Sequence, residues 1–168
     1  ECGFCQRAHH TVREIVGQYG ERVRLVHRNY PLSPVCNPQV QRDMHPNACL
    51  AAKAALCADA QGRFWDFNDL LWQNAKRLER KHLLHYARST NLDIPAFEAC
   101  LLDPKTEARL QQDIRDGIGW GVTGTPAFVI NGKMVMGALP PERFRAAIDD
   151  ALAACGKADS PAVSPTSR

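Results

Sequence analysis

The sequence predicts an α/β fold in which a group of helices interrupts a small core of helices and strands. At its start, two cysteines separated by two residues open a helical pattern that ends at Gly20, and a short strand-like run follows. Residues 46–118 carry helical patterns in succession. Two apolar runs then flank Asn131-Gly132, the strongest short-range signal for a β-hairpin, and a last helical pattern follows. This order of elements indicates a divided α/β core.

Length and composition are those of one globular domain. The chain has 168 residues, of which 45% are hydrophobic and 23% charged. The net charge of +3 is too small to favour a nucleic acid or a membrane surface as partner. The longest apolar runs are only a few residues, so the sequence predicts no transmembrane span.

Seven cysteines are a high count for a domain of this length. Proteins of reducing compartments rarely use so many, whereas an oxidising compartment turns cysteines into disulfides. We therefore expect a periplasmic or otherwise extracytoplasmic protein. The odd number leaves at least one cysteine outside intramolecular pairs.

The first helical pattern depends on Ala8, Val12 and Ile15, which recur at the 3.6-residue period. Residues 21–30 come next and predict a strand that runs into a proline-rich loop. A helix followed by a strand suggests a β-α-β unit, whose first strand would precede Glu1. That strand is absent from the sequence, so we expect the core to lack it.

The remaining elements divide the chain into a core, an insertion and a tail. The helices expected in the insertion are Asn47–Ala60, a stretch that begins at Phe64, Pro95–Leu102, and one that Asp103-Pro104 caps and that reaches Ile118. The core is expected at 1–45 and 119–155, the helical insertion at 46–118, and a disordered tail rich in Ser, Pro and Ala at 156–168.

The first pair of cysteines has the spacing of a redox pair. Cys2 would lie at the start of a helix, where unpaired N–H groups and the helix dipole stabilise an anion, here the thiolate that attacks disulfides. Cys5 lies one helical turn deeper and is placed to resolve the mixed disulfide. Zinc sites use the same C-x-x-C spacing, so the pair alone does not decide between the two.

The order of elements resembles the thioredoxin superfamily, and more narrowly its DsbA-type branch, in which a helical domain interrupts the thioredoxin motif. The resemblance is carried by Cys2-Gly3-Phe4-Cys5 and by the run from Gly121 to Gly132. The segment from Cys36 to Trp65 also resembles DsbA-type domains fused to, or encoded beside, vitamin K epoxide reductase homologues. The resemblance implies a thioredoxin-like fold with a helical insertion and a protein disulfide oxidoreductase that needs no cofactor.

In this family the proline that precedes the hairpin is cis and lies against the C-x-x-C pair, and the resemblance gives that place to Pro126. Thr125 would then offer its backbone to an extended substrate strand beside Cys2. The expected catalytic residues are thus Cys2 and Cys5, and the expected substrate-binding residues are Thr125 and Pro126.

The resemblance implies cysteine-containing proteins as substrates and a membrane redox partner, such as a quinone-linked vitamin K epoxide reductase homologue or a DsbB-like protein, and no nucleic acid. The Gly3-Phe4 dipeptide resembles the isomerase branch more than the strongest oxidants. The helical insertion favours disulfide formation, with a reductase or an isomerase as the alternative. A glutathione-using relative is disfavoured because such proteins do not need a second cysteine.

A metal-binding protein is a further alternative, with Cys2, Cys5, Cys36, His45 and Cys49 as zinc or copper ligands. The interval from Cys36 to Cys49 is wider than the usual zinc spacing, so we expect no metal site.

We expect Cys36 and Cys49 to form a structural disulfide, because a loop limited by Pro38 and Pro46 separates them. Two alternatives stay open, namely that Cys36 pairs with Cys57, or that Cys49 and Cys57 are buried thiols. If Cys36 and Cys49 are paired, at least one of Cys57, Cys100 and Cys155 is expected to be a buried thiol.

Overall fold

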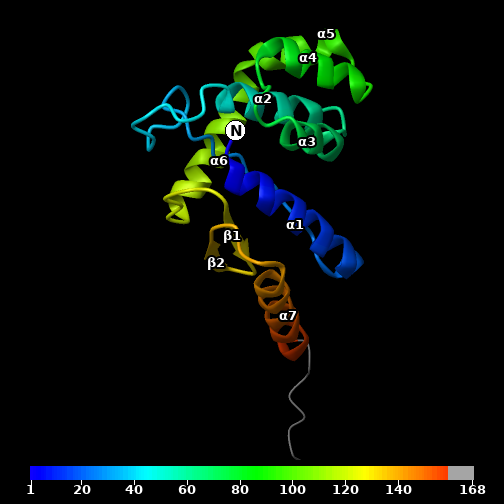
Figure 1. Ribbon diagram of the computed structural model, residues 1–168, viewed down its shortest axis with the longest axis vertical. Helices are drawn as coiled ribbons and strands as arrows, with labels where there is room; N and C mark the ends of the chain where they lie inside the picture. Colours follow the sequence, from blue (N-terminus) through cyan, green and yellow to red (C-terminus); the bar gives the residue numbers. More distant parts are fainter. Residues whose placement is uncertain (159–168) are drawn as a thin grey trace, which may run out of the picture.

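The chain folds into a helical group and a core of helices around a hairpin, and α6 joins the two, as the computed structural model shows for residues 1–158 (Figure 1). The first helix, the helical insertion, the hairpin and the last helix are found in the predicted order. In chain order the elements are α1 (Gly3–Tyr19), the 3₁₀ turn η1 (Gly20–Arg22), α2 (Ala48–Asp59), α3 (Phe64–Gln73), α4 (Arg80–Ser89), α5 (Ile94–Leu102), α6 (Pro104–Gly119), β1 (Ala127–Ile130), β2 (Lys133–Met136) and α7 (Pro141–Ala158).

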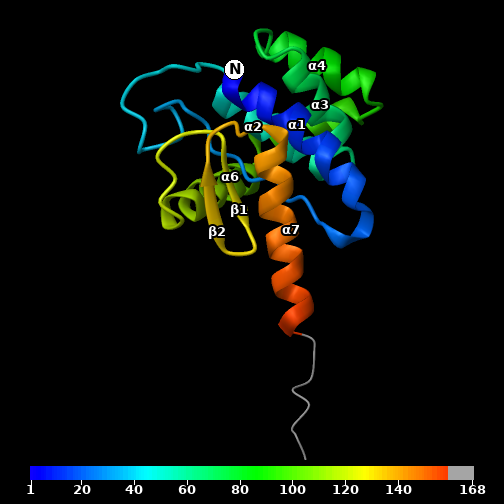
Figure 2. The same ribbon diagram turned by 60° about the horizontal axis from the view of Figure 1, so that its bottom comes forward.

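The core is formed by α1, α7 and the hairpin, which lie together in Figure 2. Val12 and Ile15 on the buried face of α1 pack with Phe144 and Ile148 of α7. Phe128 of β1 meets Phe144 edge to face, with the ring centroids 4.7 Å apart. This packing fixes the helix that carries the two N-terminal cysteines against the strand that follows Pro126.

The hairpin has the register that its turn sequence predicts. Ala127 lies opposite Met136 and Ile130 opposite Lys133, in antiparallel pairing. Asn131 and Gly132 fill the two-residue turn, both with positive φ, which asparagine and glycine tolerate better than other residues.

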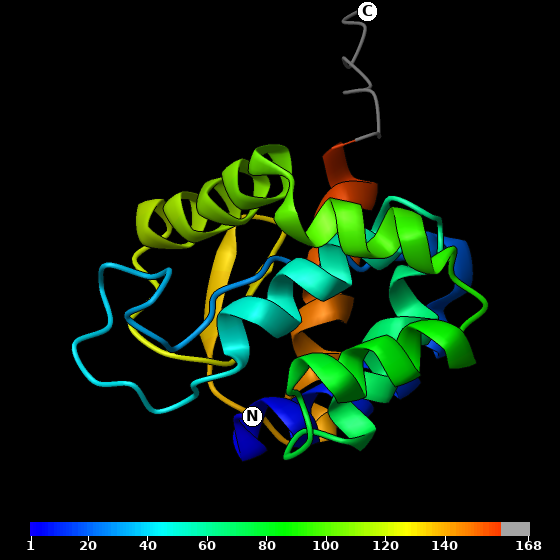
Figure 3. The same ribbon diagram turned by 90° about the horizontal axis from the view of Figure 1, so that it is seen from above.

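The helical insertion, α2 to α5, has its own core of small and aromatic side chains. Alanines of α2 allow α3 and α5 to approach closely, and Phe67 and Phe97 fill the centre with no exposed surface. From this group α6 extends toward the side of the molecule that holds the hairpin (Figure 3). Asp103 caps α6, accepting a hydrogen bond from the Lys105 N–H at 2.8 Å. The insertion is thus connected to the core through a rigid helix.

The strand predicted at residues 21–30 is not formed, and this prediction was wrong. Its beginning is the turn η1, and the rest runs extended to the prolines without pairing to any strand within residues 1–158. The β-rich sequence gives an extended backbone, but a strand also needs a neighbour for its ladder of hydrogen bonds. Among the described residues, the only strands are β1 and β2, and these pair with each other.

A cavity of about 1000 Å³ separates this extended segment from β1. Apolar side chains of α1 and α7 line it, together with Phe128 of β1 and Leu25 of the extended segment. The cavity therefore extends from the N-terminal cysteine pair, along α1, to the side of β1 that faces the extended segment.

Two disulfides connect the loops and helices. Cys36 is bonded to Cys49, which ties the proline-rich loop to α2, and Cys57 is bonded to Cys100, which ties α2 to α5. The expectation of a buried thiol among Cys57, Cys100 and Cys155 was wrong, because two of them are paired and Cys155 is exposed on α7. The two members of the second disulfide are 43 residues apart, so no local pattern indicated it.

The end of the chain differs slightly from the expected boundary. Helix α7 continues to Ala158, so residues 156–158 belong to the helix rather than to the expected tail. The rest of that tail lies outside the described residues. No helix among residues 1–158 has the length and apolarity needed to cross a bilayer.

Candidate active site

The two N-terminal cysteines occupy different positions at the start of α1. Cys2 is the residue just before the helix, with an extended backbone, and its carbonyl accepts the Gln6 N–H at 3.0 Å. Cys5 lies inside the first turn. Both are thiols that lie outside the two disulfides. The sequence places them within reach of each other, since residues three apart on a helix are neighbours.

The surroundings move the two thiol pKa values in opposite directions. Partial burial raises the pKa of Cys2, but hydrogen bonds from the backbone and thiol of Cys5, from the Phe4 backbone and from Thr125 outweigh it, so the pKa is lowered overall. Burial, together with the neighbouring Cys2 charge, raises the pKa of Cys5 to about 12. Cys2 is therefore the more acidic of the two thiols, and Cys5 stays protonated at neutral pH.

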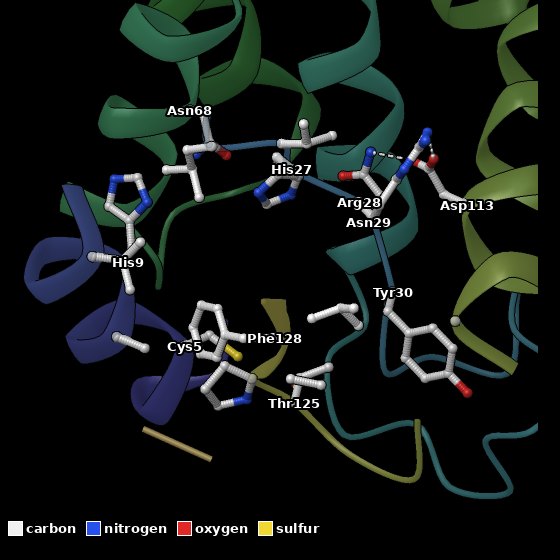
Figure 4. Close-up of a pocket in the computed structure, with 18 of the residues that line it drawn as sticks. Cys5, His9, His27, Arg28, Asn29, Tyr30, Asn68, Asp113, Thr125 and Phe128 are labelled. Carbon is white, nitrogen blue, oxygen red and sulfur yellow. Dashed lines mark hydrogen bonds and ion pairs between the residues drawn. The ribbon is translucent and has the colours of Figure 1, made fainter. Parts of the chain in front are cut away.

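The loop after α6 brings a second set of groups to this pair. The Thr125–Pro126 peptide bond is cis, and the Cys2 Sγ lies 3.9 Å from the Thr125 carbonyl oxygen. Figure 4 shows Cys5, Thr125 and Phe128 on the same side of the cavity. The four residues expected at the site, Cys2, Cys5, Thr125 and Pro126, are brought together at one end of that cavity.

Contacts with the helical insertion hold the cysteine-bearing helix in place. Gln6 donates to the Trp72 carbonyl at 2.5 Å, and His9 Nε2 lies 2.7 Å from the Asp69 carboxylate. The Glu1 carboxylate accepts hydrogen bonds from the backbone N–H and the side chain of Asn47 at 3.0 and 3.1 Å. The site is thus fixed between the core and the insertion.

The arrangement suits thiol–disulfide exchange. A Cys2 thiolate can attack one sulfur of a substrate disulfide, forming a mixed disulfide and releasing the other sulfur as a thiolate. Cys5, once deprotonated, can attack Cys2 Sγ and release the substrate as a thiol. The pair is then oxidised by two electrons and the substrate reduced by two, and the same steps in reverse form a substrate disulfide.

The cavity behind Cys5 also has a polar end. His27 and Asn68 face into it in Figure 4, and the Asn68 Nδ2 is buried without a hydrogen-bond partner. Burial lowers the pKa of His27 to about 4. The nearby Asp113 charge and the hydrogen bond with Asn29 act in the opposite direction, but their effect on the pKa is smaller. His27 is therefore neutral at physiological pH.

The five residues of the alternative metal site do not form a ligand set. Cys36 and Cys49 are joined to each other by a disulfide, so neither offers a thiolate to an ion. Among residues 1–158, no group of three or more His, Cys, Asp or Glu side chains has an arrangement suited to a metal.

Sequence reasoning missed several residues that shape the site. Asp113, Gly117 and Tyr30 fix the extended segment to α6 and the following loop. Asn29 and Asp113 are 84 residues apart, so only an alignment of related sequences could have signalled the contact.

Comparison with known proteins identifies the family. A family model described as the DSBA-like thioredoxin domain matches residues 1–149. The Na⁺/H⁺ antiporter NhaA 3 of Salinispora tropica is 37% identical over 153 residues, which are 91% of this chain and 22% of the antiporter. The antiporter NhaA of Herminiimonas arsenicoxydans is 28% identical over 89% of the chain and 22% of its own length. The chain thus spans about a fifth of the length of these relatives.

Solved structures agree with the fold. A thioredoxin-like oxidoreductase from Silicibacter pomeroyi matches with a TM-score of 0.75 and 27% identity, over 89% of this chain and 80% of that one. The thiol-disulfide exchange protein alpha-DsbA2 of Wolbachia pipientis matches with a TM-score of 0.74 and 19% identity, over 89% of this chain and 75% of that one. The name of the Silicibacter pomeroyi structure agrees with the enzyme class expected from the sequence. The predicted fold is confirmed, and the chain belongs to the family of DSBA-like thioredoxin domains.

Proposed function

We propose that this domain is a protein disulfide oxidoreductase in which Cys2 is the nucleophile and Cys5 the resolving cysteine. The observation that carries the proposal is the opposite shift of the two thiol pKa values beside Thr125 and Pro126. A lowered pKa at Cys2 favours the attacking thiolate, and a high pKa at Cys5 keeps that thiol protonated while Cys2 reacts.

The direction we propose is disulfide formation in substrate proteins. The lowered Cys2 pKa supports it, because stabilising the thiolate stabilises the reduced pair and makes the disulfide form more oxidising. The alternative is a reductase or an isomerase, which the Gly3-Phe4 dipeptide favours. The reduction potential of the pair, measured by equilibration with glutathione, tests the direction. A value near about −120 mV indicates an oxidase and one near about −270 mV a reductase.

The substrates we propose are extracytoplasmic proteins with cysteines in extended segments, bound along Thr125 and Pro126. Two structural disulfides support an oxidising compartment such as the periplasm. A disulfide-forming enzyme must be reoxidised after each turnover, so we propose a membrane redox partner, such as a quinone-linked vitamin K epoxide reductase homologue or a DsbB-like protein.

Ion transport is not part of the proposal. The match to the antiporters covers 22% of their length, and it lies on the thioredoxin-like part of this chain. The likeness supports a thioredoxin-like domain in those proteins, and nothing in the site described above provides a path for an ion.

A further inference from the structure

The extended segment is attached to α6 by a buried carboxylate. Asp113, on α6, is 4% exposed and accepts hydrogen bonds from the backbone N–H of Asn29 at 3.0 Å and from its side chain at 2.9 Å. The Arg28 guanidinium lies 3.2 Å from the other carboxylate oxygen. Three hydrogen-bond donors from Arg28 and Asn29 meet one buried carboxylate, and they fix the position of the extended segment along the axis of α6.

Tyr30 follows Asn29 in the extended segment, and its ring packs against Gly117, one helical turn after Asp113 on α6. A Cβ on Gly117 would come within 2.6 Å of Tyr30 Cδ2 and 2.8 Å of Cε2, which are not possible contact distances. Residues four apart share a helix face, so Asp113 holds the backbone and Gly117 receives the ring of the same short segment.

The Tyr30 hydroxyl then reaches the loop that leads to the active site. It donates to the Val122 carbonyl at 3.2 Å, while the Val122 N–H donates to the Gly117 carbonyl at 2.9 Å. Gly121, with φ of +73°, donates to the Ile118 carbonyl at 2.8 Å, which completes the turn that ends α6. Both backbone groups of Val122 are therefore held.

Val122 is three residues before Thr125, whose carbonyl oxygen faces the Cys2 sulfur. We propose that Tyr30, seated on Gly117, is a positioning residue that fixes the Val122–Thr125 loop for peptide binding. A loop that is already ordered loses less conformational entropy when a substrate strand pairs with it. The proposal rests on the proposed exchange function, and it adds that the Tyr30 hydroxyl orders the loop through its hydrogen bond to Val122.

Tyr30→Phe tests the proposal, because it removes the hydroxyl and leaves the ring on Gly117. With glutathione as the reductant that regenerates the dithiol, the protein turns over a synthetic peptide disulfide at several concentrations, and separately bis(2-hydroxyethyl) disulfide, which is too small to bind along the loop; the rate without protein is subtracted. We expect the KM for the peptide to rise roughly three- to tenfold, the range for one lost hydrogen bond. We expect this rise to exceed any change in the rate with the small disulfide.

Tyr86→Phe is the matched control. Its hydroxyl donates to the Arg77 carbonyl at 3.0 Å inside the helical insertion, so it loses the same kind of bond far from the loop. The proposal is overturned if Tyr30→Phe and Tyr86→Phe give the same peptide KM, or if Tyr30→Phe slows both disulfides equally. Absence of exchange in the wild-type protein would instead refute the proposed function itself.

Discussion

At the scale of single residues, a displacement of one helical turn separates the roles of two cysteines. Cys2 lies outside the first turn, where backbone N–H groups are unpaired, while Cys5 lies inside it and is more buried. The same side-chain chemistry therefore has a lowered pKa at Cys2 and a raised one at Cys5, which is the basis of the roles proposed for them.

We expect alkylation to distinguish the two thiols by pH. Because the Cys2 pKa is lowered, its rate of reaction with iodoacetamide should reach a plateau below the pH at which an ordinary thiol does. Cys5, with a pKa of about 12, should stay unlabelled across that range. Mass spectrometry of peptides from briefly labelled protein measures both rates.

A short cysteine-containing peptide labelled in parallel serves as the reference for an unperturbed thiol. Labelling of Cys5 before Cys2, or a Cys2 profile that coincides with that of the reference peptide, would contradict the assignment of roles.

At the scale of elements, the ring of Tyr30 can approach α6 closely because residue 117 is a glycine. We expect Gly117→Ala to lower the free energy of unfolding by about 1–3 kcal/mol, since the added Cβ must displace the ring. Gly119 is in the same helix with open space around it, so Gly119→Ala should leave stability unchanged or raise it by up to about 1 kcal/mol. Urea denaturation of both variants gives the comparison, and equal effects would contradict the packing described.

The two disulfides are expected to differ in their contribution to stability. The chain-entropy estimate is about 3 kcal/mol for Cys36–Cys49, whose partners are 13 residues apart, and about 4 kcal/mol for Cys57–Cys100, whose partners are 43 apart. Replacing both members of each pair by alanine, followed by denaturant unfolding, tests this order. A larger loss for the Cys36–Cys49 pair would show that the loop-length argument does not hold here.

Over the whole molecule, local sequence patterns predicted most helices and the hairpin. They could not predict contacts between residues that are far apart in the sequence. The cysteine pair, the Asn-Gly turn and the helix caps each act within a few residues, so the sequence located them. The strand at residues 21–30 failed because an extended backbone becomes a strand only beside a partner. The Tyr30 contact with Val122 joins residues 92 positions apart, which no periodicity reveals.

The arrangement of the whole molecule also explains why the site lies where it does. The helical insertion holds α1 through Gln6 and His9, and α6 carries the loop with Thr125 across to Cys2. The four site residues therefore belong to the core, and the insertion holds the helix that carries the cysteines in place. The cavity of about 1000 Å³ beside β1 is lined by residues of both.

The most direct test of the account is to trap the mixed disulfide with a peptide. Cys5→Ser protein is incubated with a peptide that carries one disulfide, quenched in acid, digested without reduction and analysed by mass spectrometry. Because Cys5 alone is placed to release the substrate, we expect the peptide to accumulate on Cys2, and Cys2→Ser protein to form no such adduct. An adduct found chiefly on Cys155, or equal amounts of adduct with and without Cys2, would contradict exchange through this site.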